Sequence, residues 1–156
     1  MASTPDPRVV LGAWEPYYST MVPGLWLNEG GWSAAGAAID HLVTLHPAAT
    51  ARAEGLSLVE WLDRETLRMS GGPEQVVRLA DGVHVVPEFL GNRSTFANPD
   101  ARAVIAGLGL DRDMASLVRL YVAGLCGIGY GFRQLLDRLE VDGVAIATIM
   151  ARGGAA

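Results

Sequence analysis

Lysine is absent from this chain of 156 residues, and all twelve of its basic side chains are arginines. The absence excludes a Walker phosphate loop, which needs its lysine, and any Schiff-base lysine. Cysteine is nearly absent too: Cys126 alone cannot form an internal disulfide, and it fits a reducing compartment, so we expect a cytoplasmic protein. Basic charge is scarce, since the formal net charge is −5, and this argues against a nucleic-acid partner.

Apolar residues, by contrast, make up 50% of the chain. This proportion predicts one globular domain over residues 1–156 with a sizeable core. The most apolar segment is an expected helix over Asp113–Leu139. Its uncharged stretch between Arg119 and Arg133 is too short to cross a bilayer, so we interpret it as a core helix and expect no membrane partner.

Strand-like and helix-like patterns alternate along the chain, which favours an α/β fold. Apolar periodicity and turn residues set the expected boundaries. We predict strands over Arg8–Trp14, Gly24–Leu27, Val83–Val86, Val104–Leu108 and Val144–Ile149, and helices over Ser33–His46, from Ser57 to Ser70–Pro73, and over Asp113–Leu139.

Local signals support two of the helix starts and one packed helix face. Ser33 is a plausible N-cap of the first helix, and Ser57 with Glu60 forms a capping box for the second. Three glycines of the long helix share one face, although each costs roughly 1 kcal/mol against alanine in a helix interior. These glycines are Gly124, Gly127 and Gly131. Their shared face predicts close contact with a sheet or another helix.

Glycine-rich turns follow two of the expected strands. The segment Gly24–His41 joins a strand to a helix start, where small residues let a ligand approach and free N–H groups favour phosphate. The pair Gly153–Gly154 follows the last expected strand. Two such turns suggest nucleotide binding, although tight packing would explain Gly30, Gly31 and Gly36 equally well.

Other polar residues have two interpretations each. The pair Asp40–His41 is compatible with acid–base chemistry, but a solvated helix face is the more common explanation. Glu29 could be catalytic, yet we favour a role in fixing its loop. The early aromatic residues are first explained by core packing, with a sugar-stacking wall as the alternative. The three histidines lack metal-ligand spacing with Cys126 or with carboxylates, so we predict no metal site.

Five short motifs occur in one order from about Gly12 to Ala156. They are Leu25–Gly31 followed by Ala35–Ala37, Val86–Ser94 followed by Asn98–Arg102, Ala106–Leu108 before the long helix, Gly129–Arg133 within it, and Ala151–Ala155. Together they resemble the FGGY family of carbohydrate kinases. The Asn-Glu-Gly-Gly and Gly-Asn-Arg-Ser variants look most like its ribulokinase-like branch.

The resemblance implies a partial actin-like ATPase domain (ribonuclease H-like), an α/β fold with a mixed sheet and flanking helices. It implies part of an ATP-dependent kinase that phosphorylates a sugar or polyol hydroxyl, a pentulose such as ribulose, with the help of Mg²⁺. This chain would contribute the ATP-binding side of the cleft. Carried over, Gly36 would donate its N–H to ATP phosphate, Asp40 would approach the nucleotide, and Gly153 and Gly154 would pack on it.

The resemblance also places the catalytic aspartate and the N-terminal phosphate loop outside this chain. We therefore nominate no catalytic residue here. We expect a truncated C-terminal domain that is inactive alone, lacks its N-terminal kinase domain as a partner, and associates through uncovered apolar surface, as in a homo-oligomer. The alternative is a catalytically inactive remnant or interaction domain that retains the ATPase-domain core.

Overall fold

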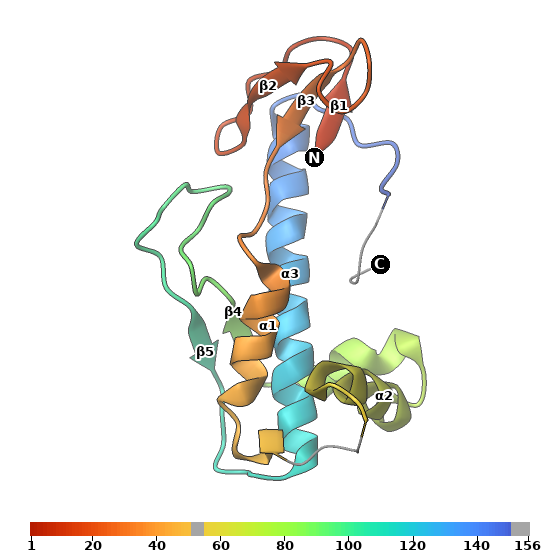
Figure 1. Ribbon diagram of the computed structural model, residues 1–156, viewed down its shortest axis with the longest axis vertical. Helices are drawn as coiled ribbons and strands as arrows, with labels where there is room; N and C mark the ends of the chain where they lie inside the picture. Colours follow the sequence, from red (N-terminus) through yellow and green to blue (C-terminus); the bar gives the residue numbers. More distant parts are fainter. Residues whose placement is uncertain (51–54, 151–156) are drawn as a thin grey trace. The chain divides into compact units, whose positions relative to one another are not determined.

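The computed structural model describes residues 1–50 and 55–150 (Figure 1). Contacts divide these residues into two compact units. The first unit holds residues 1–31, 93–97 and the described part of 132–156, and the second holds the described parts of 32–92 and 98–131. The longest helix, α3 (Met114–Val141), contributes residues to both. The expectation of a single domain stays a prediction.

The first unit is built on a small antiparallel sheet in the order β1-β3-β2. Its strands are β1 (Ala2–Thr4), β2 (Trp14–Tyr18) and β3 (Trp26–Glu29), and Ala2 lies opposite Asn28. The C-terminal part of α3 supplies apolar side chains to the core of this unit. The buried members of that core are Ala2, Val10, Leu135, Leu139 and Val144.

Turns displace the first two predicted strands. The strand expected over Arg8–Trp14 is wrong, because β2 begins only at Trp14. The Ala13 N–H donates to the Val10 carbonyl at 3.0 Å, and Gly12 has a φ of +84°, so this stretch is a tight turn. The strand expected over Gly24–Leu27 begins two residues later, at Trp26. A turn again precedes it, since Gly24 has a φ of +78°.

The predicted last strand, Val144–Ile149, is also wrong: residues 144–150 form neither helix nor strand. Gly143, with a φ of +84°, donates its N–H to the Glu140 carbonyl, and Val144 donates to the Leu139 carbonyl at 2.9 Å. These two bonds form a Schellman motif, with Val144 and Leu139 as its hydrophobic pair. Val144 therefore completes the end of α3.

The second unit packs three helices and an antiparallel hairpin around one core. In Figure 1, α1 (Ala35–Thr44) and α2 (Leu58–Ser70) lie against α3. Strands β4 (His84–Val86) and β5 (Val104–Ala106) pair with each other, and two 3₁₀ helices, η1 (Pro47–Thr50) and η2 (Pro73–Ala80), connect the elements. The side chains with least exposure include Leu42, Leu62, Leu117, Leu120 and Val118.

The glycine face of α3 confirms the predicted close contacts. A Cβ added at Gly124 would lie 2.5 Å from Cδ2 of Leu42 in α1, and one at Gly127 would lie 2.2 Å from the Val85 carbonyl oxygen in β4. A Cβ at Gly131 would overlap the indole of Trp32. Each glycine thus admits a different neighbour: a helix, a strand edge and an aromatic ring.

The helix α3 is long and apolar enough, by length and composition, to cross a membrane; no other helix in the described residues is. Part of its apolar surface packs inside the second unit, where Leu117, Val118 and Tyr121 are at most 2% exposed. This burial supports the interpretation as a core helix. The absence of a membrane partner stays a prediction.

Candidate functional site

The start of α1 has no side-chain cap. Its N-cap residue, Ala34, adopts a left-handed backbone (φ 55°, ψ 50°), and no acidic residue lies in the first turn. The prediction that Ser33 caps this helix is therefore wrong, because the helix begins one residue too late for Ser33 to act as the cap. Side chains thus leave the N–H groups of the first turn unused, and these groups favour an anion.

Gly36 lies in that first turn and Asp40 lies one turn further along. Both are exposed, and a spacing of four residues places them on the same face of the helix. A Cβ added at Gly36 would meet nothing within 4 Å. Four other residues of α1 are buried, namely Ala38, Ile39, Leu42 and Val43. Open space at a helix start is what a ligand needs in order to reach the backbone.

The segment that leads into α1 contains Trp32, whose indole packs directly on Gly131 of α3. The two glycines before Trp32 differ from each other. A Cβ at Gly30 would lie 2.8 Å from Cδ1 of Leu135, whereas one at Gly31 would meet nothing within 4 Å. Tight packing therefore explains Gly30 but not Gly31.

A polar pair that no sequence motif indicated links α2 to α3. The Tyr121 hydroxyl, on a side chain that is 2% exposed, donates to Oδ1 of Asp63 at 2.5 Å. Burial is the main cause that raises the pKa of Tyr121, followed by Asp63 and then by the charge of Asp40. The pair joins residues 58 positions apart, which is why local patterns could not reveal it.

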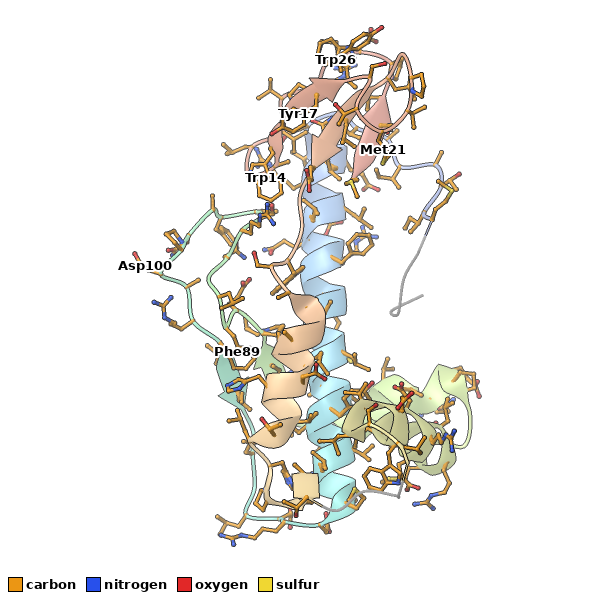
Figure 2. The ribbon with its side chains drawn as sticks, in the orientation of Figure 1. Trp14, Tyr17, Met21, Trp26, Phe89 and Asp100 are labelled. Carbon is orange, nitrogen blue, oxygen red and sulfur yellow. The ribbon has the colours of Figure 1, made fainter. Side chains whose placement is uncertain are left out.

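The residue after Asp40 packs against the loop that follows β4. The ring of His41 meets the ring of Phe89 edge-on, with centroids 4.9 Å apart (Phe89 is labelled in Figure 2). Next to Phe89, Glu88 is buried, and its Oε1 accepts a hydrogen bond from Nδ2 of Asn92 at 2.6 Å. Burial raises the pKa of the Glu88 carboxyl, and the Asn92 bond opposes this.

Among the early aromatic residues of the first unit, Tyr17 and Tyr18 are exposed, whereas Trp14 and Trp26 are partly buried (Trp14, Tyr17 and Trp26 are labelled in Figure 2). Tyr17 and Tyr18 are 45% and 60% exposed, so core packing does not explain them. Tyr18 tilts against Trp26, and the Arg93 guanidinium lies 3.7 Å above the Trp14 ring. Through this cation–π contact, the Arg93 side chain packs against β2.

One pair of predicted nucleotide contacts lies beyond what the structure tests, and the role predicted for Glu29 is not found. Gly153 and Gly154 lie outside the described residues. Within the described residues, the carboxylate of Glu29 has no hydrogen bond that would fix its loop, and no group of three or more His, Cys, Asp or Glu side chains is placed to hold a metal ion. Gly36 and Asp40 are thus the predicted nucleotide contacts that the structure places together.

Comparison with known proteins identifies the family of this chain. A family profile described as "FGGY family of carbohydrate kinases, C-terminal domain" matches residues 1–156. FGGY carbohydrate kinase domain-containing proteins of Xenopus laevis and Homo sapiens are 39% and 38% identical over 99% of this chain and 29% of their own length. A D-ribulokinase of Saccharomyces cerevisiae is 34% identical over 96% of this chain and 22% of its own length.

A crystal structure of xylulose kinase from Rhodospirillum rubrum superimposes with a TM-score of 0.64 and 25% identity, over 92% of this chain and 25% of that one. The fold is therefore the α/β class of actin-like ATPase domains. Within that class, the chain belongs to the FGGY family of carbohydrate kinases, whose members are phosphotransferases. It spans less than a third of the length of the curated relatives it matches.

Proposed function

We propose that this chain forms the ATP-binding side of the cleft in an ATP-dependent kinase that phosphorylates a pentulose such as ribulose. The observation that carries the proposal is the uncapped start of α1. It combines first-turn N–H groups that no side chain caps, open space at Gly36, and the exposed carboxylate of Asp40 one turn away. Gly36 would bind a phosphate oxygen through its N–H.

The residues at this helix start fit a magnesium nucleotide. Mg²⁺ keeps several waters and is commonly held by substrate phosphates with only one or two carboxylates, so a dedicated protein cage is not required. When bound, the metal neutralises charge on the phosphates. Asp40 would accept a hydrogen bond from a water of the hydrated Mg²⁺, and this would relieve its repulsion with phosphate. The first-turn N–H groups orient the phosphate chain.

The sugar class is supported by the D-ribulokinase from yeast among the relatives and by the ribulokinase-like motifs of this chain. Since the chain covers a minor part of those relatives, we propose that the sugar contacts and the catalytic base come mostly from an N-terminal kinase domain. The half-buried free thiol of Cys126 is compatible with a cytoplasmic location.

Two matched variants of the complete protein test the nucleotide role. Gly36→Ala places a methyl group where phosphate would approach, and we expect the KM for ATP to rise roughly tenfold, about 1.4 kcal/mol of lost binding, with the KM for pentulose unchanged. Gly129→Ala, also in open space on a helix, should change neither value. ADP release over a panel of pentuloses gives both constants.

Unchanged kinetics in the Gly36→Ala variant would contradict the placement of the nucleotide. Absence of phosphorylation of any pentulose by the complete protein would instead favour the alternative, a catalytically inactive remnant or interaction domain that keeps the ATPase-domain core.

A further inference from the structure

The first turn of α1 is held by few contacts of its own. The carbonyl of its N-cap residue, Ala34, accepts the Ala38 N–H at 2.9 Å, but Ala34 has a left-handed backbone and no side-chain cap. Gly31 precedes Ala34 and Gly36 follows it, and a Cβ added at either glycine would meet nothing within 4 Å. A strained backbone persists only where its surroundings fix it. Another contact must therefore hold this turn in place.

Trp32 makes such a contact, two residues before the N-cap. A Cβ added at Gly131 of α3 would lie 2.6 Å from Cε2 and 2.9 Å from Cη2 of the Trp32 indole, and closer still to Cζ2. These atoms belong to the six-membered ring, so this ring lies directly on the backbone of α3. Trp32 and Gly131 are both partly buried, and both belong to the second unit. The segment before α1 is thus packed against a helix that contributes to the core of that unit.

The contact depends on the absence of a side chain at residue 131. Glycine costs roughly 1 kcal/mol against alanine in a helix interior, yet the methyl group of an alanine at this position would overlap the indole. Gly129, two residues earlier in the same helix, faces open space and admits no such neighbour. Trp32 and Gly131 therefore form a matched pair, because a change in either residue removes the contact.

A packed indole restricts the backbone that leads into the helix. An aromatic side chain supplies a large contact area and loses only two side-chain torsions when it packs. Anchoring Trp32 limits the conformations open to the chain between Trp32 and Ala34, and with them the direction of the first-turn N–H groups of α1. Groups that already point at an anion bind it more tightly than groups that must be ordered on binding.

We propose that Trp32, packed on Gly131, is a positioning residue for the nucleotide: its indole holds the first-turn N–H groups of α1 in the orientation that binds phosphate. The inference rests on the proposed nucleotide site at Gly36. Trp32 acts through the backbone of α1 and does not need to touch the nucleotide itself. Its role concerns the affinity for ATP and leaves the affinity for pentulose unchanged.

A double-mutant cycle in the complete protein tests this role. Calorimetry gives the Kd for ATP with Mg²⁺, which requires no turnover, and steady-state kinetics gives the KM for pentulose. We expect Gly131→Ala and Trp32→Ala each to raise the Kd for ATP by about threefold or more, with the KM for pentulose unchanged. Adding Gly131→Ala to Trp32→Ala should have no further effect, because the ring that the methyl group would displace is gone. Gly129→Ala should leave the Kd at the parent value.

Trp61→Ala is the control for a purely structural role, because Trp61 is partly buried against the same core but lies on α2. It should lower the melting temperature, which is measured for every variant, and leave the Kd for ATP unchanged. Additive effects of the Trp32 and Gly131 substitutions, or an equal loss of ATP binding in Trp61→Ala, would overturn the inference.

The Gly36→Ala variant separates this inference from the proposed function. If Gly36→Ala weakens ATP binding while Gly131→Ala does not, the positioning role of Trp32 is wrong and the nucleotide site stands. Parent-like ATP binding in Gly36→Ala would contradict both.

Discussion

At the scale of single residues, the glycines of α3 show how far a pattern can be trusted. Their spacing correctly predicted a tightly packed face at Gly124, Gly127 and Gly131. It could not say that the neighbours would be a helix, a strand edge and an indole, because these neighbours come from distant parts of the chain. Gly129 lies in the same helix but faces open space.

Because Gly127 is tightly packed and Gly129 is not, substitution by alanine should change the unfolding free energy in opposite directions at the two positions. Gly127→Ala would press a methyl group against the backbone oxygen of Val85, which cannot move away as a side chain can, so we expect a loss of about 1–3 kcal/mol in unfolding free energy. Gly129→Ala should be neutral or gain up to about 1 kcal/mol from helix propensity. Urea unfolding followed by tryptophan fluorescence measures both, and equal effects would refute the packing argument.

Glu88 makes a pH-dependent contribution to stability. Because burial raises its pKa in the folded state, the folded protein favours the protonated form. The stabilising contribution is present below the unfolded pKa and is lost as the pH rises through the higher folded pKa. Glu88→Gln keeps an acceptor for Asn92 and should be more stable than the parent at neutral pH, with a gain that shrinks in acid.

Urea midpoints at several pH values check this expectation. The exposed Glu140→Gln provides the control, and its midpoint should follow the parent at every pH. A Glu88→Gln variant that is less stable than the parent at neutral pH would show that the charged form is favoured in the folded state.

At the scale of elements, the three helices were predicted, and so were the hairpin strands expected over Val83–Val86 and Val104–Leu108, which are β4 and β5. The strands expected over Arg8–Trp14 and Val144–Ile149 were not found. Helix signals are local: the Ser57–Glu60 capping box and the Gly71 terminus bound α2 as expected, and α1 and α3 lie within two residues of their predicted ends. A strand needs a partner elsewhere in the chain. Apolar alternation alone therefore mistook the turn at Val10–Ala13 for a strand, and the same error occurred for the segment after Gly143.

The two expected caps provide a matched test at this scale. Ser57 accepts the Glu60 N–H, and the Glu60 carboxylate accepts the Ser57 N–H at 2.8 Å. Ser57→Ala should therefore cost about 1 kcal/mol. Ser33→Ala should cost nothing measurable, because Ser33 makes no capping bond to α1. Thermal unfolding distinguishes the two, and a comparable loss from Ser33→Ala would contradict the observed start of α1.

At the scale of the whole molecule, apolar side chains remain on the surface of both units. Those with the greatest exposure include Val9 at 82%, Leu110 at 98% and Met150 at 79%. The chain spans under a third of its relatives, which contain residues with no counterpart here. The predicted nucleotide contacts Gly36 and Asp40 could be proposed from local motifs because both lie on one helix.

We expect this chain, produced by itself, to associate despite its net charge of −5, because uncovered apolar surface drives association. Size exclusion with light scattering should show dimers or larger species, and raised salt should increase their share by screening like charges. A clean monomer at high concentration that binds no hydrophobic dye would show that the two units cover their own cores.

The uncapped start of α1 has a thermodynamic consequence. Ala34 holds a backbone conformation that costs an alanine about 1–2 kcal/mol, and no side chain compensates the free N–H groups beyond it. A phosphate bound there would complete the helix and so act as a folding ligand. At a hundredfold excess over its dissociation constant it would add about 2.7 kcal/mol to stability. The melting temperature of this domain would then rise with nucleotide concentration even in the absence of a sugar substrate.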